Sequence, residues 1–115
     1  MTLIFVMLNS TKIKRKIEIN NFIQLTQNYS KTQIECTPHT FFRLSQKQRE
    51  IFTCDELKRI LIHEKPFLTG IQKNQNYAAF YEYKDKILKM ILRINDRKIN
   101  IVTFYFIEQW QIPRI

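Results

Sequence analysis

Three segments rich in β-branched and aromatic residues fill the second half of the sequence, and they constrain the fold more than any other feature. They span residues 77–83, 87–94 and 98–107. Only short polar runs separate them, a pattern typical of antiparallel strands joined in a meander. In the second segment apolar residues alternate with Lys89 and Arg93. This alternation predicts one sheet face against a core and the other partly in water.

Two helices are expected before these strands. Pro38 suits the first turn of a helix, and the residues that follow predict a helix to about Glu50 with a cationic stripe beside its apolar stripe. The run Thr53-Cys54-Asp55-Glu56 matches a capping box, so a second helix is predicted to begin at Thr53 and to end before Pro66.

The expected fold class is α+β, with two helices packed on an antiparallel sheet of about four strands. Residues 32–37 supply the fourth strand, and 115 residues suit a single globular domain. Within it, residues 1–31 are interpreted as an N-terminal extension and residues 32–115 as the main body. In the extension, residues 3–8 favour a buried strand, whereas residues 13–19 fit either a strand or a helix.

The charge balance indicates a polyanionic partner. Nineteen Lys and Arg against ten Asp and Glu give a net charge of +9 and a sequence pI near 9.8. Excess positive charge attracts phosphate backbones through counterion release, so nucleic acid is the first expectation. An anionic membrane surface or an acidic protein is the second, and solubility alone is the third.

Several classes of site are excluded or disfavoured by what the sequence lacks. With Gly70 as its one glycine, the chain has no glycine-rich phosphate loop, and it contains neither HExxH nor GxSxG. We expect no cofactor and no metal. Cys36 and Cys54 are too far apart for a CxxC motif, and we interpret them as buried thiols. The apolar run of residues 3–8 is short and precedes its basic cluster, so we expect a cytoplasmic protein without a membrane segment.

A titratable imidazole lies close to several cations on the first predicted helix. His39, Arg43, Lys47 and Arg49 follow one another at short spacing. Metal-free cleavage of RNA needs a base for the 2′-hydroxyl proton, cations for the phosphate and an acid for the leaving oxygen. These side chains have the required chemistry. The alternative is that they are solvated helix charges.

Two further residues are candidates for nucleic-acid binding, together with Lys47 and Arg49. Arg59 is expected on the water side of the second helix, and Tyr105 lies on the last predicted strand. A tyrosine on an exposed sheet face can stack an unpaired base. The alternative is that the aromatic residues fill the core beneath the helices.

The run Thr37-Pro38-His39-Thr40-Phe41-Phe42-Arg43-Leu44, the capped helix from Thr53 and the strand Ile101-Val102-Thr103-Phe104-Tyr105 resemble the RelE and BrnT toxins of toxin–antitoxin pairs. The resemblance covers roughly residues 32–107. It implies a RelE- or barnase-like fold and a metal-independent ribonuclease that a small acidic antitoxin neutralises. By this resemblance His39, Arg43 and Thr103 are the catalytic residues. The match at Arg49 is loose, because the family's glycine after that position is absent.

A second function is compatible with the same fold. In it the domain is a non-catalytic module that binds nucleic acid or protein, for example one encoded by a mobile element.

Overall fold

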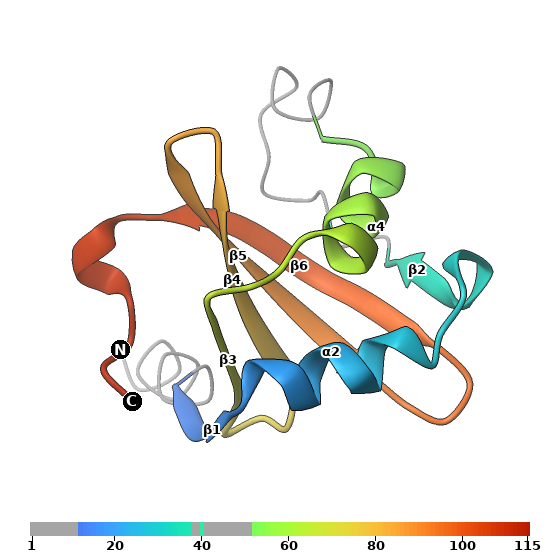
Figure 1. The fold of residues 1–115 in the computed structure, drawn as a ribbon, viewed down its shortest axis with the longest axis horizontal. Helices are drawn as coiled ribbons and strands as arrows, with labels where there is room; N and C mark the ends of the chain where they lie inside the picture. The colour runs from blue at the N-terminus through green and yellow to red at the C-terminus, as the bar shows by residue number, and fades with distance from the viewer. Residues whose placement is uncertain (1–11, 38–39, 41–51) are drawn as a thin grey trace, which may run out of the picture.

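A computed structural model describes residues 12–37, 40 and 52–115 of the chain and arranges them as one sheet with two α-helices on one of its faces (Figure 1). Their elements are β1 (Ile13–Ile17), α2 (Ile19–Gln27), η1 (Lys31–Gln33), β2 (Ile34–Cys36), α4 (Cys54–His63), β3 (Leu68–Gln72), β4 (Tyr77–Tyr83), β5 (Lys86–Ile94), β6 (Ile99–Ile107) and η2 (Gln109–Gln111).

The sheet has six strands in the order β1-β3-β4-β5-β6-β2. All neighbouring pairs are antiparallel except β2 and β6, which run parallel. The meander predicted from the sequence is confirmed as β4, β5 and β6. Its first turn is the pair Lys84 and Asp85, both with positive φ (46° and 65°), as a tight two-residue hairpin requires.

The expected sheet of about four antiparallel strands is therefore wrong, because the structure has a mixed, six-stranded sheet. Two strands at one end have no alternating pattern. All five residues of β3 are buried, which removes the polar positions that reveal a half-exposed strand. β1 is an edge strand whose centre is Lys14, Arg15 and Lys16. Charges on an edge strand disfavour pairing with another chain, and three in a row remove the alternation by which a strand is predicted.

The only glycine in the sequence lies where β3 meets this edge strand. A Cβ atom on Gly70 would come within 2.7 Å of Ile13 Cγ2 and 2.9 Å of the Arg15 carbonyl oxygen. Real side chains do not tolerate such approaches, so glycine permits the close β1–β3 contact.

The two open interpretations of residues 13–19 each hold for part of the segment. The chain is a strand to Ile17 and a helix from Ile19. The helix, α2, buries Phe22 and Thr26, and Phe22 is only 1% exposed within the main core. Residues 13–27 thus supply an edge strand of the same sheet and a helix that packs on it. The strand expected at residues 3–8 and, apart from residue 40, the helix expected at residues 39–50 lie outside the described residues.

The two faces of the sheet differ. We call the face covered by α2 and α4 the helix face, and the opposite one the open face (Figure 1). The helix-face core contains Leu57 and Ile60 of α4 packed on Met90, Leu92 and neighbouring strand residues. A smaller apolar cluster lies on the open face, with these buried members: Leu68, Ala78, Phe80 and Ile91.

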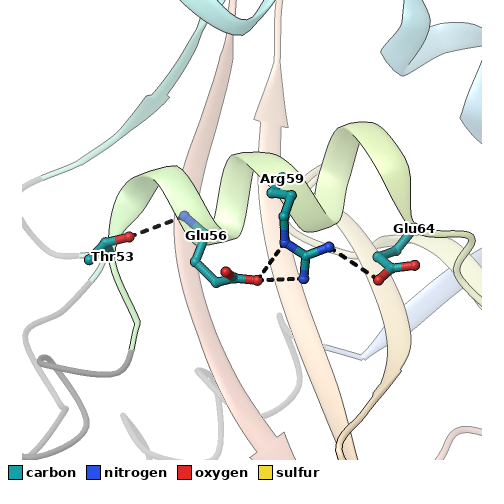
Figure 2. Close-up of polar contacts among 4 residues, drawn as sticks. All are labelled: Thr53, Glu56, Arg59 and Glu64. Atoms are coloured by element: carbon teal, nitrogen blue, oxygen red, sulfur yellow. Dashed lines mark hydrogen bonds and ion pairs between the residues drawn. The ribbon is translucent and has the colours of Figure 1, made fainter.

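The helix predicted from Thr53 is confirmed as α4, which ends at His63, before Pro66. The Thr53 hydroxyl accepts a hydrogen bond from the Glu56 amide at 3.2 Å (Figure 2). The return bond of a capping box is not formed, because the Glu56 carboxylate accepts from Arg59 instead.

The two cysteines are bonded to each other. Cys36 ends β2 and Cys54 begins α4, and their Cα atoms lie 6.0 Å apart in a disulfide that closes 18 residues of sequence separation. The expectation of free buried thiols is therefore wrong. Sequence spacing alone did not show that α4 packs beside β2.

Within residues 12–37, 40 and 52–115, each helix is too short or too polar to cross a lipid bilayer.

Candidate nucleic-acid interface

The structure describes three of the seven residues predicted for the site. Thr103, Tyr105 and Arg59 are described. The other four lie outside the described residues: His39, Arg43, Lys47 and Arg49.

The chain on either side of residues 38–39 is fixed to β6. The Thr40 hydroxyl, on a residue only 2% exposed, donates to the Ile101 carbonyl at 2.7 Å. The Thr37 amide donates a hydrogen bond to the same carbonyl at 3.4 Å, and the Thr40 amide donates to the Thr37 carbonyl at 3.0 Å. A short turn is thereby anchored two residues before Thr103.

Thr103 and Tyr105 lie on the open face of β6. Phe104 and Phe106, which alternate with them, belong to the helix-face core. Tyr105 is 38% exposed, and Thr103 is partly exposed. The two residues therefore present two hydroxyls and one aromatic ring on the side of the sheet opposite the helices.

Lys89 of β5 is the cross-strand neighbour of Tyr105. Its ammonium nitrogen lies 5.5 Å from the centroid of the Tyr105 ring and 5.5 Å from the centroid of the Phe80 ring. Phe80 is fully buried, so the Lys89 stem lies across an apolar floor while its charge lies beside an exposed ring. A cation and a stacking surface are thus held together.

The same two strands add a second cation. Ile91 pairs with Thr103, and Arg93 pairs with Asn100, with a bulge that leaves Val102 as the extra residue of β6. Arg93 is exposed and lies on the open face, like Lys89. We call this group the β5–β6 patch: Lys89, Arg93, Asn100, Thr103 and Tyr105.

The cations of the patch are not neutralised. Lys31 pairs with Asp55 at 3.9 Å and Lys98 with Glu35 at 3.1 Å. Neither Lys89 nor Arg93 forms an ion pair in the part of the chain that the structure describes. Unpaired cations beside an apolar floor are available to bind phosphate.

Arg59 is not part of this group. It lies on α4, on the other side of the sheet, and its guanidinium bridges two carboxylates (Figure 2). The Arg59 Nε donates to Glu56 at 2.8 Å and Nη1 donates to Glu64 at 3.3 Å. These hydrogen bonds, the Glu56 one first, raise the pKa of Arg59. The positive charge of Arg59 is therefore already paired with Glu56 and Glu64.

The patch has groups suited to binding, and it contains neither a histidine nor a carboxylate. It contains cations, hydroxyls, an amide and a ring, whereas an imidazole or carboxylate is the usual proton carrier at neutral pH. The imidazole predicted from the sequence, that of His39, lies outside the described residues. Within the described ranges, no cluster of three His, Cys, Asp or Glu side chains is arranged to hold a metal ion.

Three members of the patch were not predicted as site residues: Lys89, Arg93 and Asn100. Alternation along β5 placed Lys89 and Arg93 on the wetter face. What was missing was the register between β5 and β6, which decides that Lys89 faces Tyr105 and that Arg93 faces Asn100.

Comparison with family models, curated proteins and solved structures finds no match to this chain. Membership of the RelE and BrnT toxins therefore stays a prediction that rests on the sequence motif.

Proposed function

We propose that this protein binds single-stranded RNA through the β5–β6 patch. One observation carries the proposal: the unpaired Lys89 ammonium lies 5.5 Å from the ring centroid of the exposed Tyr105. An unpaired base stacks on an aromatic ring, and an adjacent cation contacts its phosphate.

The rest of the patch suits the same ligand. Arg93 is four residues from Lys89 on one strand, so roughly 13 Å separates the two positions, which allows contacts with different phosphates. On the neighbouring strand, Thr103 provides a hydroxyl and Asn100, which faces Arg93, provides an amide. Such groups bond base edges and the ribose 2′-hydroxyl.

The direct test is binding of a short single-stranded RNA to Tyr105→Ala and Tyr105→Phe, measured by fluorescence anisotropy. Loss of stacking costs about 1 to 3 kcal/mol, so Tyr105→Ala is expected to weaken binding about fivefold or more. Tyr105→Phe keeps the ring and is expected to bind like wild type. Equal affinity of wild type and Tyr105→Ala, or equal affinity for a duplex of the same sequence, would refute the proposal.

Cleavage of the bound RNA is a second proposal, and the anchored turn at Thr37 and Thr40 favours it. Their hydrogen bonds to the Ile101 carbonyl fix the chain that flanks His39 beside β6. In this proposal the protein is a RelE- or BrnT-like toxin with a small acidic antitoxin. Arg43 holds the phosphate, His39 transfers a proton, and Thr103 orients one of them.

The cleavage proposal predicts degradation of RNA in the presence of EDTA and growth arrest on expression. His39→Ala is expected to lower the cleavage rate about a hundredfold while binding persists. Equal rates for wild type and His39→Ala would remove His39 from the chemistry. Binding without any cleavage would leave the non-catalytic module.

Location in the cytoplasm is also a proposal, and it requires that reducing conditions there open the Cys36–Cys54 disulfide. Disulfides persist in oxidising compartments and are rare in reducing cytoplasm. Trapping of free thiols in intact cells is expected to modify both cysteines if the protein stays in a reducing compartment, and neither if it does not.

A further inference from the structure

A pocket lies on the helix face, between α2 and the β1 edge of the sheet. Its volume is about 380 Å³, which is in the range of pockets that hold small molecules. The lining residues that matter here are Arg15, Lys16, Glu18, Asn21, Phe22 and Tyr77.

The register of three strands builds one wall of this pocket. Arg15 of β1 pairs with Ile71 of β3, and Ile71 pairs with Tyr77 of β4. A cation, an aliphatic side chain and an aromatic ring thus form one row across the sheet. Phe22 of α2, only 1% exposed, supplies an apolar floor.

The polar groups of the pocket have no partner of their own. Arg15, Lys16 and Glu18 form no ion pair within the described ranges. The side chains of Asn21 and Tyr77 likewise make no hydrogen bond there. Convergent, unpaired polar groups above an apolar floor are the usual composition of a ligand site.

We propose that this pocket binds a single nucleotide. A planar base fits between the Tyr77 ring and the Arg15 guanidinium, both of which stack on bases. The Asn21 amide and the Glu18 carboxylate offer a donor and acceptors to a base edge, and the Arg15 guanidinium, which lies on the same face as Tyr77, also offers a charge to the phosphate. Each kind of group that recognises an unpaired nucleotide is present in this one pocket.

This site is separate from the β5–β6 patch. Three strand spacings of about 4.8 Å lie between β1 and β5, and the two sites are on opposite faces of the sheet. The pocket therefore goes beyond the proposed function, and each can fail without the other.

The test is titration of the protein with adenosine, guanosine, cytidine and uridine 5′-monophosphates, followed by calorimetry. At least one is expected to bind with a Kd below about 1 mM, and the corresponding nucleoside more weakly. Arg15→Gln is expected to weaken binding about tenfold, as loss of a hydrogen bond to a charged group does. Lys14→Gln removes the same charge from the same strand outside the pocket and is expected to change nothing.

A second pair of variants tests the stacking wall. Tyr77→Phe keeps the ring and is expected to bind the nucleotide, whereas Tyr77→Leu is expected to lose most of the affinity; circular dichroism checks that both are folded. The proposal is overturned if no mononucleotide binds, if Lys14→Gln and Arg15→Gln weaken binding equally, or if folded Tyr77→Leu binds like wild type.

A free nucleotide and the phosphorylated end of an RNA chain carry the same chemistry, and competition separates them. Displacement of the mononucleotide by a 5′-phosphorylated oligonucleotide, but not by its 5′-hydroxyl form, identifies an RNA end. No displacement by either identifies the free nucleotide. Tyr105→Ala, which tests the patch, is expected to leave mononucleotide affinity unchanged.

Discussion

An exposed polar side chain is either engaged within the fold or available to a partner, and this distinction separates two exposed arginines. Arg59 bridges Glu56 and Glu64, whereas Arg93 is exposed on the open face without an ion pair in the described part of the chain. A positive charge that already has two carboxylates attracts a phosphate weakly. Only Arg93 is therefore placed in the interface.

Substituting each arginine by glutamine tests this distinction. Arg93→Gln is expected to weaken binding of single-stranded RNA about tenfold, through loss of a charge-assisted hydrogen bond. Arg59→Gln is expected to change the affinity less than about twofold at physiological salt, because screening limits the effect of a distant charge. Anisotropy titrations measure both. Equal losses would mean that binding depends on total charge and not on placement.

Two tyrosine hydroxyls differ in whether they form a hydrogen bond within the fold, with consequences for stability. Tyr81 is 1% exposed and its hydroxyl has no hydrogen-bond partner among residues 12–37, 40 and 52–115, whereas the Tyr29 hydroxyl donates to the Asn95 carbonyl. Tyr81→Phe is expected to raise the free energy of unfolding by about 1 kcal/mol, because it removes an unsatisfied buried group. Tyr29→Phe is expected to lower it by about 1 kcal/mol. Urea denaturation measures both, and a destabilised Tyr81→Phe would contradict the account.

Tyr81 also makes a prediction about alkaline pH. Burial, followed by the charge of Glu64, raises the pKa of the Tyr81 hydroxyl above its ordinary value of 10.0. The unfolded chain therefore loses this proton at lower pH than the folded protein does. The free energy of unfolding therefore decreases as the pH rises above 10, because the unfolded chain ionises at this tyrosine before the folded protein does. Denaturation between pH 9 and 11 is expected to show a smaller decline for Tyr81→Phe than for wild type, and an equal decline would argue against it.

At the element scale, α4 is fixed at its N-terminus by two different devices. Thr53 caps the first turn, and the next residue, Cys54, joins the helix to the end of β2. Leu57, Ile60 and Leu61 then pack on the sheet. The N-terminal end of α4 is thus held by a hydrogen bond and a covalent bond, in addition to the packing of the helix on the sheet.

The cap predicts a modest and specific loss. Thr53→Ala is expected to lower the free energy of unfolding by about 1 kcal/mol, because the Glu56 amide loses its acceptor. Thr53→Ser keeps the hydroxyl and is expected to remain within about 0.5 kcal/mol of wild type. Chemical denaturation measures both. If alanine and serine have the same effect, the hydroxyl does not stabilise the helix.

The disulfide predicts a larger loss. Closing 18 residues of sequence separation stabilises a fold by about 3 kcal/mol in the chain-entropy treatment. Cys36→Ser/Cys54→Ser is expected to lose about that much in denaturation, and wild type is expected to behave alike once reduced. A thiol assay that finds two free cysteines in the native protein would contradict the bond.

The elements that the sequence predicted have complete local signals, and those that it missed do not. β5 alternates between apolar and polar residues, β4 and β6 are rich in β-branched and aromatic residues, and α4 has both a cap and an apolar stripe. β3 is buried throughout and β1 is charged, so neither shows a period of two. The parallel β2–β6 pairing and the Cys36–Cys54 bond join segments that are far apart in the sequence, so no local pattern predicts them.

The candidate site divides along the same line. Alternation along one strand placed Thr103 together with Tyr105. Which cations face them depended on the register of β5 with β6, which no local pattern encodes. The availability of the Arg59 charge depends on the carboxylates of Glu56 and Glu64, three residues before it and five residues after it.

At the scale of the whole molecule, the net charge of +9 accounts for attraction to any polyanion. It does not distinguish one face from another. The structure does, because cations on η1, on α4 and just before β6 are already in ion pairs, while the open face keeps two unpaired cations, one of them beside an exposed ring. The central claim is that RNA binds at these two cations and not through diffuse charge.

The salt dependence of RNA binding tests that claim most directly, in two variants that each remove two positive charges. Lys89→Gln/Arg93→Gln changes the patch, whereas Lys58→Gln/Lys65→Gln changes α4 and the residues after it, on the other face. Each phosphate contact with a single strand contributes about 0.7 to the slope of log affinity against log salt. The account predicts a slope shallower by about 1.4 for the patch variant and an unchanged slope for the other. Equal changes in both slopes would contradict it.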